Sequence, residues 1–105
     1  MNYTYVLLSE QDGRFYTGST TDLRARVRLH AAGRVRSTAS RAPLVLINYE
    51  ACVDLDDARR RERFLKTGKG KRYLNNRLAA HLAVIRRNKL ERHKEGIQCN
   101  SCGRC

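Results

Sequence analysis

The fold of this chain is decided by residues 3–18, YTYVLLSEQDGRFYTG. Two segments of this stretch, Tyr3–Leu8 and Arg14–Gly18, are rich in the aromatic and β-branched residues that favour strands. Gln11-Asp12-Gly13 stands between them, and Asp-Gly tolerates the positive φ angles of a tight turn. The stretch therefore predicts an antiparallel β-hairpin at the start of the chain.

The hairpin brings tyrosines together, because side chains alternate between the two faces of a strand. A two-residue turn at this place puts Tyr16 on the same face as Tyr3, Tyr5 and Leu7. Each tyrosine taken alone is an ordinary strand aromatic with a satisfied hydroxyl. In a functional site, we expect nearby positive charge to make a tyrosine hydroxyl more acidic, so that it can accept a proton from water.

The next segment predicts a helix. Ser19-Thr-Thr-Asp22 resembles a capping box, the helix should run to about Ala32, and Gly33 supplies its stop. At 100° per residue, Arg26 and His30 lie side by side on the border of the apolar row. Arginine offers a planar fork to a phosphate, and histidine can take or relay a proton near neutral pH. Taken alone, this spacing favours a solvated face of a basic helix over a phosphate site.

The middle of the chain predicts a third strand and a second helix. Leu44–Glu50 is a continuous apolar run, which indicates a strand buried on both faces. Asp54 caps a helix of about Leu55–Lys66, whose inward stripe we expect to be Leu55, Ala58 and Leu65.

Glu62 projects between the residues of that stripe. An unpaired buried carboxylate is unfavourable, so it should be paired or bound to a cation. The ordinary alternative is a salt bridge to Arg59 or Lys66, one turn away on either side. We favour a metal ion, because Mg²⁺ takes one or two protein carboxylates and completes its shell with water and phosphate oxygens.

Beyond this helix, we expect Gly68–Arg72 to be a flexible basic linker. A third helix should follow, with apolar residues and one histidine at helical spacing, namely Leu74, Leu78, His81, Leu82 and Ile85. Residues 1–87 would form a single domain, and 88–105 a polar, mobile C-terminal tail. The spacing of Cys99, Cys102 and Cys105, with His93 nearby, resembles a zinc site, but one isolated cluster without a second pair favours reduced cysteines in a mobile tail.

The charge of the chain indicates a polyanionic partner. Twenty-two Lys and Arg against ten Asp and Glu give a formal net charge of +12, above the roughly 2–8 typical of a small soluble domain. We expect nucleic acid to be bound by basic residues of the first helix, the loop after it and the glycine-lysine segment: Arg24, Arg28, Arg36, Lys69, Lys71 and Arg72. No apolar run approaches the ~20 residues of a membrane span, and no signal peptide is evident, so we expect a cytoplasmic protein.

Taken together, these motifs resemble those of the GIY-YIG nuclease domain, in its short stand-alone bacterial, UPF0213-like type. The resemblance covers about residues 3–78, and Tyr3 stands where the family name has glycine. The matching stretches, in order, are Tyr3-Thr-Tyr5, Tyr16-Thr-Gly18-Ser-Thr-Thr-Asp-Leu23, Arg26-x3-His30 and Ala58-Arg-Arg-Arg-Glu62-Arg-Phe-Leu-Lys-Thr-Gly-Lys-Gly70.

The resemblance implies an α+β fold, a small three-stranded antiparallel sheet flanked by helices, with the site on one sheet face. It implies that Tyr5 is the general base and that Tyr16 contacts phosphate or positions water. Arg26 would stabilise the phosphate, His30 would assist proton transfer, and Glu62 would hold Mg²⁺ or Mn²⁺. Gly18 would let the backbone pass close to the site, and Asn75 or Asn76 would fill the place of an asparagine that many members carry.

The function that follows is metal-dependent hydrolysis of DNA phosphodiester bonds, structure-selective or weakly specific, in DNA repair or processing. RNA is not excluded as a substrate, and a protein partner could supply targeting. One alternative is a nucleic-acid-binding module that keeps the nuclease fold without significant turnover. A basic protein bound to ribosomal RNA would explain the charge but not the inward position of Glu62.

Overall fold

The computed structural model describes the backbone of residues 1–101 and the side chains of residues 1–91. The first compact unit is Met1–Leu74, and a second unit begins at Asn75. Within residues 1–101, three strands and four helices, with one 3₁₀ turn, follow in this order: β1 (Asn2–Ser9), β2 (Phe15–Thr20), α1 (Leu23–Ala31), η1 (Ala39–Arg41), β3 (Leu44–Cys52), α2 (Leu55–Leu65), α3 (Gly68–Arg77) and α4 (Ala79–Ser101).

The sheet is antiparallel with strand order β2-β1-β3, so β1 is central. Gly13 has a φ of +73° in the β1–β2 turn, as the Asp-Gly signal predicts. Leu7 pairs with Tyr16 and Tyr5 pairs with Gly18, which confirms that both tyrosines lie on one face. The predicted three-stranded α+β fold is confirmed.

The prediction that the third strand is buried on both faces is wrong. β3 is an edge strand, none of its residues is fully buried, and Tyr49 is 55% exposed. The strand buried on both faces is instead β1, where every residue from Thr4 to Ser9 is buried. An apolar run signals strand character, but its place in the sheet depends on which neighbours pair with it.

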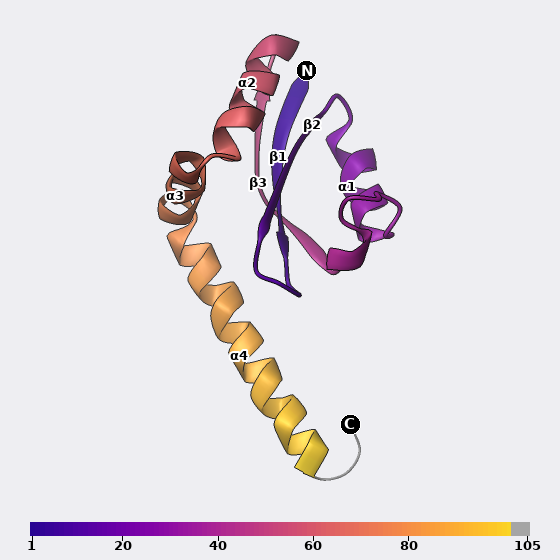
Figure 1. Cartoon of the computed structure of the whole chain (residues 1–105), viewed down its shortest axis with the longest axis vertical. Helices are drawn as coiled ribbons and strands as arrows, with labels where there is room; N and C mark the ends of the chain where they lie inside the picture. The colour runs from indigo at the N-terminus through magenta and orange to yellow at the C-terminus, as the bar shows by residue number, and fades with distance from the viewer. Residues whose placement is uncertain (102–105) are drawn as a thin grey trace. The chain divides into compact units, whose positions relative to one another are not determined.

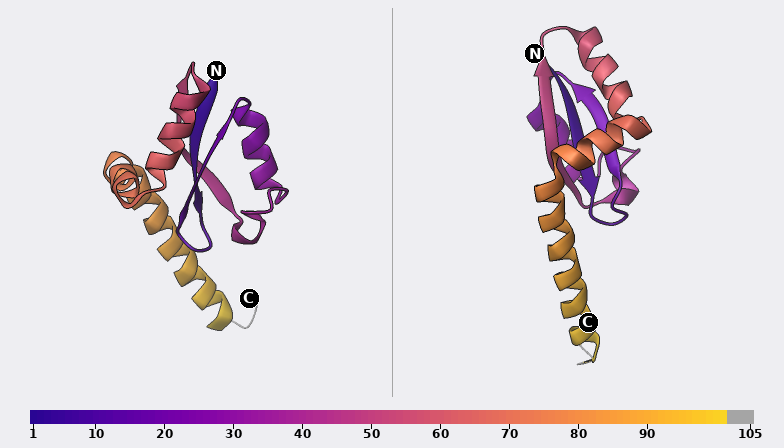
Figure 2. Two further views of the ribbon diagram at one scale, coloured as in Figure 1. Left: turned by 45° about the horizontal axis from the view of Figure 1, so that its top comes forward. Right: turned by 90° about the vertical axis from the view of Figure 1, so that its left-hand side faces the viewer.

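Helices α1 and α2 cover opposite faces of the sheet, as Figure 1 shows and the views in Figure 2 agree. Asp22 caps α1 by accepting a hydrogen bond from the Ala25 amide, and Gly33 ends the helix region with a φ of +72°. The helix therefore starts three residues later than the predicted capping box, because β2 continues to Thr20.

Asp54 caps α2, as predicted, by accepting a hydrogen bond from the Asp56 amide. Ala58 and Leu65 are buried against the sheet, and the Ala58 carbonyl accepts a hydrogen bond from the Thr4 hydroxyl of β1 at 3.0 Å. The expectation that Leu55 belongs to the same inward stripe is wrong, since this first residue of the helix is 43% exposed.

The segment Gly68–Arg72 is the start of α3 and not a flexible linker, so that prediction is wrong. The Thr67 hydroxyl accepts a hydrogen bond from the Gly70 amide and so caps the new helix. A side chain at Gly70 would collide with the Phe64 carbonyl oxygen and the Leu65 Cα atom. Glycine is present here because α3 crosses the end of α2 closely, and not because the chain is flexible.

The expected single helix around Leu74–Ile85 is two helices, since α3 ends at Arg77 and α4 begins at Ala79. Helix α4 runs to Ser101, through the segment for which an irregular tail was expected. The side chains of His93, Cys99, Cys102 and Cys105 lie outside the described residues. Among the described residues, no helix is long and apolar enough to cross a membrane.

Candidate active site

Tyr5 and His30 form the buried centre of the candidate site. Each is 1% exposed, and 3.0 Å separates the Tyr5 hydroxyl from His30 Nε2. The other ring nitrogen, Nδ1, lies 2.8 Å from Thr38 Oγ1, which is fully buried. Strand β1, helix α1 and the loop before η1 thus each contribute one member of a hydrogen-bonded row.

We infer the direction of these bonds from the proton inventory. Thr38 Oγ1 also lies within hydrogen-bond distance of the Val35 carbonyl, at 3.4 Å, and if it donates its single proton there, it accepts from the Nδ1–H of His30. In that tautomer Nε2 is an acceptor, and Tyr5 donates to it. Arg26 Nε–H donates to the same Tyr5 oxygen at 3.4 Å. A continuous chain of bonds therefore runs from Arg26 through Tyr5 and His30 to Thr38.

The electrostatics of this row keep Tyr5 protonated and His30 neutral at neutral pH. Burial raises the pKa of Tyr5 above its ordinary value of 10.0 and outweighs the opposing hydrogen bond from Arg26. Burial, and then the charge of Arg26, lowers the pKa of His30 below 6.5. The hydrogen bond to Tyr5 raises the pKa of the Arg26 guanidinium. Arg26 does lower the pKa of Tyr5, as expected of nearby positive charge, but burial has the larger effect, so the pKa of Tyr5 is raised on balance.

Tyr16 and Gly18 complete this side of the site from β2. The Tyr16 ring lies 5.0 Å from the His30 ring and 6.4 Å from the Tyr5 ring, between centroids. A Cβ atom on Gly18 would lie 2.6 Å from the Tyr5 hydroxyl oxygen, closer than real contacts allow. Gly18 therefore gives Tyr5 the space to reach across the edge strand, as the resemblance implies.

Glu62 belongs to α2 and is bonded at both carboxylate oxygens. Ser19 Oγ donates to Oε1 at 2.6 Å, and Lys66 Nζ donates to Oε2 at 2.9 Å. Partial burial alone would raise the pKa of Glu62, but the bonds from Ser19 and Lys66 together hold it below its ordinary value. The carboxylate is thus ionised, and the ion pair with Lys66 that we set against metal binding is present.

The prediction that the whole site lies on one sheet face is wrong for Glu62. Its partner Ser19 pairs with Thr4, whose side chain faces α2, whereas Tyr5 and its register partner Gly18 face α1. The phenol and the carboxylate therefore lie on opposite faces of the sheet. The charge of Glu62 still makes a small contribution to the raised pKa of Tyr5.

Glu62 has the chemistry to hold one divalent ion. Its carboxylate is ionised and its side chain is 21% exposed, while Lys66 is 55% exposed and can swing away. Mg²⁺ accepts a single protein carboxylate when water and phosphate oxygens complete its shell. Within the part of the chain whose side chains are described, no three His, Cys, Asp or Glu residues gather as an all-protein metal cage.

The predicted nucleic-acid-binding residues are spread over several elements of the chain. All of them are exposed: Arg24 and Arg28 on α1, Arg36 in the loop before η1, and Lys69, Lys71 and Arg72 on α3. Asn75 and Asn76 belong to α3, and Asn75 accepts a hydrogen bond from Arg86 at 3.4 Å. Their participation in the site stays a prediction.

Two residues of the site were not predicted as members of it. Thr38 stands in a stretch rich in Ser, Thr and Ala that was read as a basic loop, and no spacing marks it as a partner of His30. Ser19 was assigned to a helix cap, but its hydroxyl holds Glu62 instead. Only the three-dimensional position of each hydroxyl reveals its role.

A family model described as the GIY-YIG catalytic domain matches residues 1–75. The chain belongs to the GIY-YIG family. The match contains all five predicted catalytic residues of this GIY-YIG domain, and it ends where the first compact unit ends, within one residue. The family expected from the sequence is thereby confirmed.

Curated relatives agree with the expected short type. A UPF0213 protein of Lacticaseibacillus paracasei is 47% identical over 57 residues, which cover 53% of this chain and 63% of that protein. A UPF0213 protein of Staphylococcus haemolyticus is 37% identical over 67 residues, covering 63% and 80%. One of Streptococcus pneumoniae is 37% identical over 68 residues, covering 64% and 68%. The chain thus spans just under two thirds of the L. paracasei protein. No solved structure gives a significant match.

Proposed function

We propose that this GIY-YIG domain is a divalent-metal-dependent endonuclease that hydrolyses DNA phosphodiester bonds. We further propose that it is structure-selective or weakly specific and acts in DNA repair or processing in the cytoplasm. The observation that carries the proposal is the row Arg26–Tyr5–His30–Thr38, in which a guanidinium, a phenol, an imidazole and a hydroxyl are joined by hydrogen bonds.

The row supports a proton relay from water to histidine. As the water oxygen forms its bond to phosphorus, the Tyr5 oxygen accepts a water proton and the Tyr5 proton passes to Nε2 of His30. Tyr5 remains neutral throughout, so its raised pKa does not hinder the transfer. To reset the relay, His30 returns its proton to Tyr5 while Tyr5 releases the proton taken from water to solvent, and solvent protonates the leaving oxygen.

Arg26 and Tyr16 would hold the phosphate in this scheme. Arg26 has Nε bonded to Tyr5 and also interacts with the Tyr16 hydroxyl, and its planar guanidinium would present a fork to phosphate oxygens at this place. Tyr16 is only half-buried and would contact the phosphate or position the water. The arriving phosphate also brings negative charge, which favours protonation of His30 during the transfer.

Glu62 would hold the ion of the proposed enzyme, with Ser19 orienting its carboxylate. A bound Mg²⁺ or Mn²⁺ would polarise the phosphate and stabilise the leaving oxygen. Before the ion binds, Lys66 must leave Oε2, and its exposure allows this.

The second candidate, a binding module without significant turnover, is favoured by two observations. Tyr5 is 1% exposed, and both oxygens of Glu62 are occupied. In that case the fold and the basic surface would bind nucleic acid, while the relay would serve only as a buried hydrogen-bond network.

Cleavage of labelled substrates separates the two candidates. Single strands, duplexes, flaps, branched DNA and RNA would be incubated with Mg²⁺, with Mn²⁺ and with EDTA. Metal-dependent cutting that is lost in Glu62→Ala, but kept in Asp57→Asn, supports the nuclease. Asp57 is the matched control because it is an exposed carboxylate on the same helix. Salt-sensitive binding without cutting of any substrate would refute the nuclease and support the module.

A further inference from the structure

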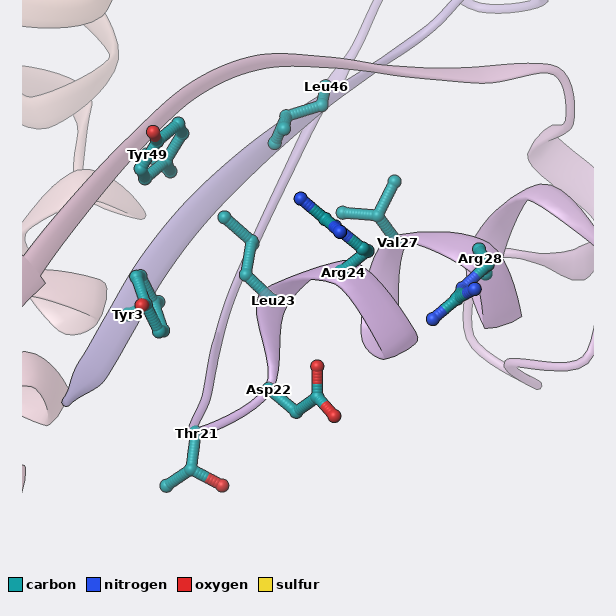
Figure 3. Close-up of a pocket in the computed structure, with 9 residues that line it drawn as sticks. All are labelled: Tyr3, Thr21, Asp22, Leu23, Arg24, Val27, Arg28, Leu46 and Tyr49. Atoms are coloured by element: carbon teal, nitrogen blue, oxygen red, sulfur yellow. The ribbon is translucent and has the colours of Figure 1, made fainter.

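A pocket of about 500 Å³ lies outside the catalytic row, between the start of α1 and strand β3 (Figure 3). The sheet contributes Tyr3, Leu46 and Tyr49, and α1 with its cap contributes the opposite wall. Thr21, Asp22, Leu23, Arg24, Val27 and Arg28 form that wall. None of the predicted catalytic residues lines the pocket.

One wall of the pocket is aromatic and accessible. Tyr49 is 55% exposed although it lies on the sheet face that α1 covers, and its ring is 6.3 Å from that of Tyr3, at 60°. Leu23 of α1 faces the two tyrosines across the pocket (Figure 3). An exposed aromatic face beside aliphatic side chains is a stacking platform for a flat apolar ring.

The other wall of the pocket is basic. Arg24 and Arg28 are one helical turn apart on α1, and both are exposed. Neither makes a hydrogen bond or ion pair that would occupy its guanidinium within the part of the chain whose side chains are described. Asp22 also lines the pocket, but one of its oxygens accepts the Ala25 amide of the helix cap. Two available guanidiniums beside an aromatic platform match a ligand with a flat ring and flanking negative charge.

The pocket is adjacent to the catalytic row. Tyr49 pairs directly with Tyr5 in the β1–β3 register, so both side chains start from neighbouring positions on one face. Arg24 and Arg26 are two residues apart on α1, about 200° around the helix, and so lie on its opposite flanks. The row and the pocket therefore flank the same helix, and a nucleic acid at the row is within reach of the pocket.

We propose that this pocket binds an unpaired nucleobase of the substrate, stacked on Tyr49, with Arg24 and Arg28 contacting the phosphates on either side of it. The inference rests on the proposed function for the presence of a nucleic-acid strand at the site. A base within a duplex has both faces stacked on its neighbours and cannot enter. The pocket therefore selects substrates that carry an unpaired nucleotide close to the scissile phosphate.

Binding measured without cleavage tests this inference separately from the nuclease activity. A fluorescein-labelled single-stranded DNA 12-mer and a blunt duplex of the same 12-mer with its full complement would be titrated by fluorescence anisotropy in EDTA. Because stacking of one base on an aromatic side chain contributes about 1–3 kcal/mol, Tyr49→Ala should weaken single-strand binding about 5- to 150-fold. Duplex binding should change less than about twofold, since the platform is not used. Tyr49→Phe keeps the ring and should bind like wild type.

The contribution of the basic wall to binding is tested with a charge-matched control variant. Arg24→Ala should weaken binding of the single strand more than Arg63→Ala, an equal loss of charge on the exposed side of α2. Replacing one nucleotide of the 12-mer at a time by an abasic residue should reproduce the Tyr49→Ala loss at one or two positions only.

The outcomes distinguish the pocket from the proposed nuclease. Equal weakening of single strand and duplex by Tyr49→Ala, or no weakening of either, would overturn the pocket, even if the wild type cuts DNA. Selective loss of single-strand binding would support the pocket, even if no substrate were cut. Weakening by Arg63→Ala equal to that of Arg24→Ala would show a general charge effect and would also overturn the assignment.

Discussion

Replacing Thr38 by valine tests whether the hydroxyl of Thr38 sets the proton positions of the whole row. Valine keeps the shape of threonine, so no cavity forms, and only the hydroxyl is lost. The Nδ1–H of His30, now 2.8 Å from that hydroxyl oxygen, would be left without an acceptor in a place where both residues are at most 1% exposed. A buried donor without a partner costs about 1–3 kcal/mol, so the free energy of unfolding should fall by that amount.

The imidazole of His30 has one way to avoid this loss, which is to move its proton to Nε2. Nε2–H would then have to donate to Tyr5, whose own proton could no longer reach the ring. The relay would be broken, and we expect single-turnover cleavage to fall about 10- to 100-fold, by analogy with the loss of a partner that orients a metal-bound histidine. Thr38→Ser keeps the hydroxyl and should retain both the tautomer and most of the rate.

Urea unfolding followed by circular dichroism gives the stability of each variant, and long-range ¹H–¹⁵N NMR gives the tautomer of His30. A Thr38→Val protein within about 0.5 kcal/mol of wild type, a change no larger than that of an ordinary surface substitution, with Nδ1 still protonated, would refute the reasoning. Loss of rate in Thr38→Ser equal to that in Thr38→Val would refute the role given to the hydroxyl.

Three further predictions follow from the same contacts. Gly18→Ala forces a Cβ atom against the ring of Tyr5, so we expect urea unfolding to show about 1–3 kcal/mol of destabilisation. At Gly68 an added Cβ atom meets no atom within 4 Å, so Gly68→Ala should be neutral or stabilising. The pKa of His30 is lowered on folding, so the unfolded chain binds more protons than the folded one below pH 6.5. The free energy of unfolding should therefore fall as the pH drops from 7 to 5. In His30→Gln this dependence of the unfolding free energy on pH should be weaker. Lys66→Met removes an exposed ion pair that contributes about 0.2–0.5 kcal/mol, so the free energy of unfolding should hardly change. The carboxylate of Glu62, released from Lys66, should bind Mn²⁺ more tightly in isothermal titration calorimetry.

Each of these predictions has an outcome that contradicts it. Equal unfolding free energies for the two glycine variants would show that the row tolerates displacement of Tyr5. A slope in His30→Gln as steep as in wild type would assign the acid sensitivity to other groups. Mn²⁺ binding by Lys66→Met that is unchanged or weaker would mean that Glu62 is not the carboxylate that holds the ion.

The local patterns in the sequence predicted the parts of the fold that depend on neighbouring residues. Asp-Gly at 12–13 fixed the hairpin, period-two alternation placed Tyr16 beside Tyr5, and Asp54 capped α2 as expected. Burial could not be predicted in the same way. The apolar run of β3 is half-buried, because strand order, which is a long-range property, puts β1 and not β3 at the centre.

In the candidate site, too, local spacing could be predicted from the sequence, whereas contacts that depend on long-range packing could not. Arg26 and His30 could be predicted from helical spacing, but their connection through Tyr5 depends on packing between α1 and the sheet. Glu62 was found because a carboxylate in an apolar stripe is unusual, yet its position across the edge of β2 could not be predicted from one helix. Gly70 looked like a helix breaker, and only the crossing of α2 and α3 explains it.

The most direct test of the account is the single-turnover rate of phosphodiester cleavage by Tyr5→Phe in Mg²⁺, measured on the best wild-type substrate. The account predicts a rate lower by about 10²- to 10⁴-fold, the range for loss of a general base, with the affinity for DNA in EDTA unchanged, since only one hydroxyl of the row is removed. Cleavage by Tyr5→Phe at the wild-type rate would contradict it, because no proton could then pass from water to His30 through Tyr5.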